Sequence, residues 1–277
     1  MLAILFAVLS AVAGVWAALG CALWPLAFVG AFVGTYVGLI VLLFVVIYLM
    51  TLPVNLGIPQ QRVDRVYRRL TLWVIDFVVT LMRVRITTRG LEQTPDGRFL
   101  LVCNHLNDVD PAILMKYFPG HELAFISKRE NEQKFILGKF MHRLLCQSIN
   151  RENDREALRT IVNCVRILKE DIASVGVFPE GWVSLDRKLH HFRPGVFKIA
   201  QKAGVPIVVC TLRDTYTVLP AMRHLRPSHV QLHLVGVVQP QEYQGKTTID
   251  IAQQVYRMMA DDLGPERVLD DHGPADE

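Results

Sequence analysis

Charged side chains are absent from the first 61 residues of the 277-residue chain, and the first one is Arg62. Two apolar runs, residues 2–19 and 26–52, fill most of this stretch. As helices they would be about 27 Å and about 40 Å long. The hydrocarbon core of a bilayer is about 30 Å thick, so each helix is long enough to cross it, the second with a tilt. A cleaved signal peptide is disfavoured because no positively charged segment precedes the first run. The sequence therefore predicts membrane-embedded helices over residues 1–61, as two crossings or as a hairpin that enters one leaflet and returns.

The sequence also lacks the signatures of several protein classes. Its five cysteines are odd in number and have no CxxC spacing, which is typical of reduced thiols without disulfides or a zinc site. No HExxH motif contains any of the nine histidines, and no GxSxG motif is present, so a metalloprotease and a serine hydrolase are disfavoured. The net charge of +4 is modest, and no RNA- or DNA-binding motif occurs. We therefore expect no metal and no nucleic-acid partner.

Basic residues begin where the apolar region ends. Residues 62–89 include seven arginines and two aspartates. Apolar side chains recur there at helical spacing, and they are Trp73, Val74, Phe77, Val78, Leu81 and Met82. This pattern suits a helix at the surface of an anionic membrane, and a soluble helix packed on a domain would resemble it. We predict a basic amphipathic interfacial helix over residues 62–89, and arginines after the second apolar run predict that this side is cytoplasmic.

From residue 90 onwards, apolar runs of strand length alternate with helical patterns. Strands are predicted at residues 100–103, 123–126, 173–178, 205–212 and 230–238. The clearest amphipathic helix covers residues 154–169. This alternation predicts an α/β domain with a mostly parallel central sheet over residues 90–263, followed by an acidic flexible tail over residues 264–277.

A polar loop joins the strand at residues 100–103 to the helix that follows it. His105 lies in this loop, and Asp110 stands directly before Pro111, where the helix begins. Loops of this kind commonly carry the chemistry of α/β proteins. Asp110 is suited to be a helix N-cap, because Pro fits the first helical position. Its carboxylate is equally suited to orient His105 as a general base, and the spacing alone leaves both interpretations open.

A second polar turn follows the strand predicted at residues 173–178. It consists of Phe178, Pro179, Glu180 and Gly181. Turn formation explains the proline and the glycine, but glutamate is a poor turn residue. We therefore expect Glu180 to accept a hydrogen bond from an alcohol substrate.

Both motifs resemble those of a known family. Residues 104–110 are similar to the NHxxxxD motif of the glycerolipid acyltransferases, the superfamily of lysophosphatidic acid acyltransferase, and residues 178–181 are similar to its FPEG motif. Lys128, Gly138 and Arg151 stand at spacings similar to the second block of the family. The run at 205–208 resembles the fourth block, so that four blocks occur in the family's order.

The resemblance implies a glycerol-3-phosphate acyltransferase-like fold and a reaction. His105, oriented by Asp110, would deprotonate the hydroxyl of a lysophospholipid. The oxygen would attack the thioester of acyl-CoA or acyl carrier protein, with no cofactor and no acyl-enzyme. Lys128 and Arg151 would hold a phosphate group. The FPEG segment would bind the acceptor, and it comprises Phe178, Pro179, Glu180 and Gly181.

The sequence departs from the family motif directly after FPEG. Trp182 and Val183 stand where the family has Thr and an Arg associated with the acceptor phosphate, and Arg187, Lys188 or Arg193 could supply that charge. We expect first an integral membrane enzyme of phospholipid biosynthesis that acylates 1-acylglycerol-3-phosphate at the cytoplasmic face. The alternatives are an acyltransferase for another lysophospholipid, a glycolipid or an aminolipid, and a catalytically silent lipid-binding protein.

Overall fold

The computed structural model describes residues 2–19, 21–150, 154–224 and 226–269. In this part of the chain, seven strands form one sheet in the order β1-β7-β6-β2-β5-β3-β4. The strands are β1 (Val84–Arg89), β2 (Leu100–Cys103), β3 (Leu123–Lys128), β4 (Gln147–Ile149), β5 (Ser174–Val177), β6 (Ile207–Arg213) and β7 (Ser228–Val238). Neighbouring strands are parallel, except that β6 and β7 are antiparallel. The predicted α/β fold with a mostly parallel sheet is confirmed.

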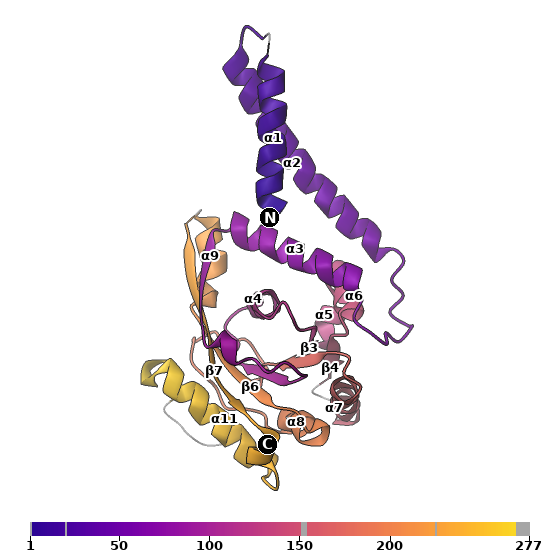
Figure 1. Cartoon of the computed structure of the whole chain (residues 1–277), viewed down its shortest axis with the longest axis vertical. Helices are drawn as coiled ribbons and strands as arrows, with labels where there is room; N and C mark the ends of the chain where they lie inside the picture. Colours follow the sequence, from indigo (N-terminus) through magenta and orange to yellow (C-terminus); the bar gives the residue numbers. More distant parts are fainter. Residues whose placement is uncertain (1, 20, 151–153, 225, 270–277) are drawn as a thin grey trace.

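Helices precede the sheet, connect its strands and cover both of its faces (Figure 1). The α-helices of the described residues are α1 (Leu2–Ala18), α2 (Trp24–Thr51), α3 (Arg65–Leu81), α4 (Asp110–Tyr117), α5 (Arg129–Glu132), α6 (Phe135–Arg143), α7 (Asp154–Lys169), α8 (Lys198–Ala203), α9 (Val218–Arg223), α10 (Pro240–Tyr243) and α11 (Thr248–Leu263). Short 3-10 helices are η1 (Leu91–Gln93), η2 (Pro194–Phe197), η3 (Thr215–Thr217) and η4 (Pro265–Arg267). Parallel strands require such crossover connections, which explains the helical cover.

Two apolar cores lie on opposite faces of the sheet. Leu100 and Val102 of β2 belong to the core that includes α7, α8 and α11, whereas Leu101 and Cys103 belong to the core that includes α4. Because both faces are covered, the central strands are continuously apolar. The cores thereby fix the carboxyl ends of β2, β5 and β3 at one edge of the sheet.

The first two helices form an antiparallel hairpin that projects from the domain (Figure 1). Near its tip, a Cβ added to Gly14 would lie 2.9 Å from the ring of Phe28, so the two helices pack closely. At its base, the ring centroid of Phe6 lies 5.5 Å from that of Phe77 in α3. Among the described helices, α2 alone is long and apolar enough to cross a membrane, and α1 has 17 residues. Both apolar runs of the sequence are therefore helical.

The helix α3 lies across the base of this hairpin (Figure 1). The side chain of Asp64 caps its first turn. The predicted segment 62–89 is only partly helical, because α3 ends at Leu81 and the chain then forms β1 beside β7. Val84 and Ile86 alternate along β1 and pack against the core that includes α4, which explains the change from helix to strand.

Candidate active site

The loop between β2 and α4 starts at a side chain that is fixed to the neighbouring strand. The Nδ2 of buried Asn104 donates to the carbonyl oxygen of Leu212 at 2.9 Å, and its Oδ1 accepts from the backbone nitrogen of Leu212 at 2.7 Å. Leu212 belongs to β6, which pairs with β2. Asn104 therefore determines where the loop leaves the sheet.

His105 and Asp110 form a hydrogen-bonded pair in this loop. The Nδ1 of His105 lies 2.9 Å from Oδ2 of Asp110. The side chain of Asp110 is fully buried, and that of His105 is 15% exposed. When the Nδ1–H group donates a hydrogen bond to the carboxylate, Nε2 is the unprotonated nitrogen and keeps its lone pair. The arrangement therefore offers an oriented proton acceptor.

The structure supports one interpretation of Asp110, the orientation of His105, and shows that the other, the helix N-cap, is wrong. Asp110 is the first residue of α4, but its side chain does not cap that helix. Its Oδ2 instead accepts from the backbone nitrogens of Leu106 at 2.7 Å and Asn107 at 2.8 Å, which precede it. One carboxylate oxygen thus closes the loop and orients His105.

An aromatic stack fixes the plane of the imidazole. The ring of Phe178 lies 4.1 Å from that of His105, centroid to centroid, with an interplanar angle of 18°. Phe125 continues the stack 5.8 Å beyond Phe178. Gly176 is the cross-strand partner of Phe125, and a Cβ there would lie 2.4 Å from the Phe125 ring. Phe178, a predicted substrate-binding residue, is therefore placed against the imidazole.

Glu180 lies in the turn after β5, but its side chain is fully buried. Its Oε1 accepts from the backbone nitrogen of His105 at 2.8 Å. Its Oε2 accepts from Oγ of Ser184 at 2.7 Å and from the backbone nitrogen of His190 at 3.0 Å. The backbone nitrogen of Ser184 in turn donates to the carbonyl oxygen of His105 at 2.7 Å. Both oxygens of Glu180 therefore accept hydrogen bonds from the chain itself, and a further bond from an alcohol substrate stays a prediction.

Burial raises the pKa of Glu180 to about 7. The main cause is the loss of solvation of the charged carboxylate, and the hydrogen bonds from Ser184, His190 and His105 partly oppose it. The carboxyl group therefore titrates near neutral pH while it joins the His105 loop to the segment at residues 184–190.

The other predicted residues lie around this turn and along the same edge of the sheet. Gly181 has a φ of 87°, and its backbone nitrogen donates to Phe178 at 3.0 Å, so that buried Pro179 is enclosed in a tight turn. Lys128 is exposed at the carboxyl end of β3, two strands from the end of β2. Arg151 lies outside the described residues. The structure thus brings the HxxxxD loop and the FPEG turn into direct contact.

Aromatic rings hold two of the cations that could replace the missing family arginine. The guanidinium carbon of Arg187 lies 4.1 Å from the ring centroid of Tyr216. That of Arg193 lies 5.9 Å from the ring centroid of Trp182, whose other neighbour is His190 at 5.6 Å. Both guanidinium groups remain available to an anion, since neither forms an ion pair with a carboxylate among the described residues.

The residues that support His105 from other strands and loops could not be predicted from the sequence. Phe125, Ser184 and His190 belong to no motif, and their spacing gives no signal, because their contacts cross between strands. The described residues contain no group of three or more His, Cys, Asp or Glu side chains that could hold a metal ion.

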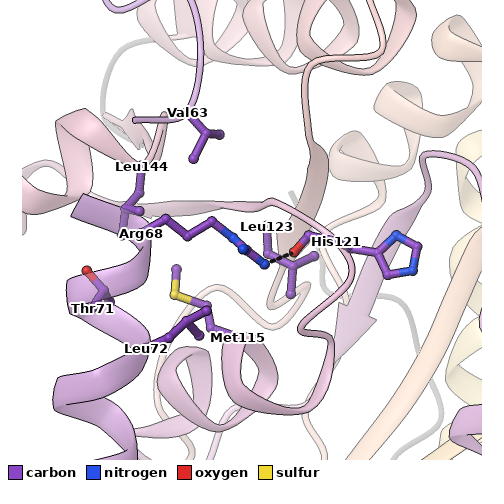
Figure 2. Close-up of a pocket in the computed structure, with 8 residues that line it drawn as sticks. All are labelled: Val63, Arg68, Thr71, Leu72, Met115, His121, Leu123 and Leu144. Atoms are coloured by element: carbon purple, nitrogen blue, oxygen red, sulfur yellow. Dashed lines mark hydrogen bonds between the residues drawn. The ribbon is translucent and has the colours of Figure 1, made fainter. Parts of the chain in front are cut away.

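A small cavity between α3 and α4 is a weaker candidate for a binding site (Figure 2). Its volume is about 10 Å³, which suits a single water molecule. Arg68 crosses it and donates to the carbonyl oxygens of Pro119 at 2.6 Å and His121 at 3.1 Å. His121 precedes β3, so the cavity lies toward the opposite edge of the sheet from His105. It is too small for a substrate.

Comparisons with known proteins show what the chain is similar to. The sequence profile of the family described as Acyltransferase matches residues 85–213, which include every predicted site residue. A probable 1-acyl-sn-glycerol-3-phosphate acyltransferase of Mycoplasma pneumoniae is 30% identical over 65% of this chain and 66% of its own length. A 1-acyl-sn-glycerol-3-phosphate acyltransferase of Chlamydomonas reinhardtii is 33% identical over 73% of this chain and 61% of its own length. The match thus spans somewhat less than two thirds of these relatives.

The fold also occurs in a solved structure. The crystal structure of the 1-acyl-sn-glycerophosphate acyltransferase PlsC from Thermotoga maritima superposes with a TM-score of 0.54. The match covers 71% of this chain and 80% of that protein, at 22% sequence identity. At this identity the likeness concerns the fold.

Proposed function

Because the chain belongs to the acyltransferase family, we propose that it acylates the free hydroxyl of 1-acylglycerol-3-phosphate in phospholipid synthesis. The acyl donor is the thioester of acyl-CoA or acyl carrier protein. The observation that supports this proposal most directly is the hydrogen bond of 2.9 Å between His105 and buried Asp110, inside the segment matched by the family.

The chemistry follows from that pair. Nε2 of His105 accepts the proton of the acceptor hydroxyl while the oxygen attacks the thioester carbonyl carbon. Asp110 stabilises the imidazolium that forms. The C–S bond then breaks, and the leaving sulfur takes the proton from the imidazolium. The products are an ester and a free thiol, and no acyl group is attached to the protein.

The supporting residues contribute by positioning. Glu180 holds the backbone on which His105 is carried, and Phe178 holds the plane of its ring. We assign Glu180 first to this positioning role, and direct binding of the acceptor alcohol by Glu180 is the alternative. A fixed ring reduces the entropy lost when the hydroxyl, the base and the thioester are aligned.

Phosphate recognition is assigned to basic side chains of the catalytic domain. Lys128 and Arg151 are the first candidates, as the family resemblance implies. Val183 leaves no cation at the usual position after FPEG, and Arg187 and Arg193 are near enough in sequence to replace it. An acceptor panel tests this assignment, because a preference for an uncharged head group would favour the alternative of a glycolipid acceptor.

The N-terminal region is assigned to the membrane. We propose that residues 1–61 are embedded and that α3 lies at the interface. The catalytic domain extends beyond the predicted residues 90–263, because β1 belongs to its sheet and Val268 is buried in its core, so only the residues after 268 are assigned to a tail. The exposed side of α3 supports this division, because Arg65, Arg69 and Trp73 are all exposed on it. The arginines after α2 favour a domain on the cytoplasmic face.

Replacement of the general base tests the proposal. His105→Ala in the purified full chain should lower the rate of free-thiol release from acyl-CoA with lysophosphatidic acid by about 10²- to 10⁴-fold. His224→Ala, at an exposed position after α9, is the matched control and should keep the wild-type rate. Full activity of His105→Ala would reject the mechanism. A wild-type chain that consumes no thioester with any lysolipid would favour the lipid-binding alternative.

A further inference from the structure

The first turn of α6 exposes three consecutive large apolar side chains. Phe135 is 51% exposed, Ile136 is 39% exposed and Leu137 is 44% exposed. Contiguous exposed apolar surface of this kind is unusual on a soluble domain and marks an interaction site. We propose that residues 135–137, here called the α6 patch, insert into the apolar layer of the bilayer beside α2.

The geometry of a helix indicates that the α6 patch is covered by lipid and not by a groove of a partner protein. Consecutive residues of an α-helix point about 100° apart, so the three side chains cover more than half of the helix circumference. A single facing groove buries only one stripe of such a turn. Hydrocarbon that surrounds the end of the helix can cover all three at once.

Direct contacts join the α6 patch to the candidate membrane span. The ring centroid of Phe135 lies 5.8 Å from that of Tyr48 in α2. Nζ of Lys139 donates to the carbonyl oxygen of Thr51, the last residue of α2, at 2.9 Å, and lies 4.4 Å from the ring centroid of Phe135. Figure 1 shows α6 on the same side of the domain as the end of α2. The patch therefore continues the apolar surface of that helix.

Charge around the patch fits lipid head groups. Residues 128–143 include five Lys or Arg side chains and two Glu side chains. Lys134 is exposed directly before the patch, and Lys139 follows it. The exposed Lys134 would bury its alkyl chain at this depth and place its amino group among anionic head groups, whereas Lys139 holds the patch against α2.

A rigid connection carries this contact to the candidate active site. A Cβ on Gly138 would lie 1.9 Å from the carbonyl oxygen of Glu132, so α5 and α6 are packed backbone to backbone. The helix α5 begins directly after Lys128 at the edge of the sheet that carries the catalytic loop. Insertion of the patch would thus determine the distance between the bilayer surface and the edge of the sheet that carries the catalytic loop. The contact itself does not depend on the proposed activity.

A site-directed fluorescence measurement tests the inference without an activity assay. In the full chain with exposed Cys21 replaced by Ser, the variant Ile136→Cys is labelled with an environment-sensitive nitrobenzoxadiazole probe. The matched control is Ile249→Cys in α11, where the isoleucine is 48% exposed. The protein is placed in phosphatidylglycerol–phosphatidylcholine vesicles that contain lipids brominated along the acyl chain.

We expect at least a twofold stronger quenching at position 136 than at position 249, together with blue-shifted emission at 136. Adding Phe135→Ser and Leu137→Ser should reduce the quenching at 136 by about half or more, because less apolar area then drives insertion. Equal quenching at the two positions would overturn the inference. Strong quenching in a chain that transfers no acyl group would support the contact and reject the proposed function.

Discussion

At the scale of single residues, the structure surrounds His105 with contacts that leave its ring little freedom. Asp110 holds Nδ1, Phe178 covers one face of the ring, and Glu180 and Ser184 hold the backbone nitrogen and oxygen. Preorganisation of this kind is what a general base needs in order to act on a hydroxyl that is bound nearby. Any single loss among these contacts should lower the rate constant more than the affinity.

We expect Glu180 to make the free energy of unfolding depend on pH between about 4.5 and about 7. Its pKa is about 7 in the folded chain and about 4.5 when solvated, so the folded state retains a proton that the unfolded state releases between these values. The free energy of unfolding therefore falls as the pH rises from about 4.5 to about 7, by roughly 3 kcal/mol at most. Glu180→Gln has no such proton, and its Tm should change less between pH 5 and pH 7.5.

The substitution Ser184→Ala should shift the pH dependence of stability in a known direction. Ser184→Ala removes a hydrogen bond that favours the ionised carboxylate, so the midpoint of the pH dependence should move to higher pH. Thermal melts of the three proteins over this range provide the measurement. Parallel curves for the wild type and Glu180→Gln would mean that Glu180 does not titrate there.

At the scale of elements, close backbone approaches decide how short helices and strands are placed. Gly176 lets the Phe125 ring lie over β5 and support the stack on His105, and Gly138 lets α6 meet α5. Neither glycine requires a positive φ, so in both cases the missing Cβ provides space and not backbone freedom. The packing at Gly176 therefore supports the ring of His105 directly, and the packing at Gly138 fixes α6 against α5.

Gly138→Ala should destabilise the protein although alanine favours helices. Its Cβ would meet the carbonyl oxygen of Glu132, which is backbone and cannot rotate away. We expect a loss of roughly 2–3 kcal/mol, or about 5–10 °C in Tm, measured by thermal unfolding. Gly195→Ala is the control, because no atom lies within 4 Å of the added Cβ and the Tm should stay within about 2 °C. An unchanged Tm for Gly138→Ala would show that α5 and α6 are not packed this closely.

At the scale of the whole molecule, apolar and basic surfaces gather at the N-terminal end of the chain. The hairpin of α1 and α2 projects from one side of the domain, and α3 crosses its base (Figure 1). The helices α8 and α11 belong to the core on the other face of the sheet, away from α4. The molecule is therefore polarised in a way that fits attachment to a bilayer at one side.

This polarity predicts a salt-dependent reaction on anionic vesicles. Raising the ionic strength from about 0.1 M to about 1 M shortens the Debye length from about 10 Å to about 3 Å and screens exposed arginines. The apparent KM for acceptor in anionic vesicles should rise several-fold, whereas neutral micelles should show little change. Arg65→Gln with Arg69→Gln should weaken the salt dependence, and Lys198→Gln with Arg257→Gln, exposed on α8 and α11, should not. Equal salt dependence in both double variants would place the electrostatic contact elsewhere.

The sequence by itself determined the class of the protein and the order of its parts. The uncharged run before Arg62 predicted the apolar helices, and the alternation of patterns predicted a mostly parallel α/β sheet, because both signals are local and periodic. The spacing of His105 and Asp110 allowed a hydrogen-bonded pair, which the structure contains. The resemblance of the motifs identified the family.

Only the tertiary structure decided what Glu180 and Phe178 contact. Glu180 bonds the backbone of His105, which is 75 positions away in the chain, and the pairing of β2 with β5 brings their loops together. Burial there also sets the pKa of Glu180, since desolvation depends on every element packed around the carboxyl group. The α6 patch likewise could be identified only from the solvent exposure of its side chains. An apolar first turn of a helix has the same sequence pattern whether it is buried or exposed. Contacts and solvation between distant segments are properties of the fold, and no local pattern encodes them.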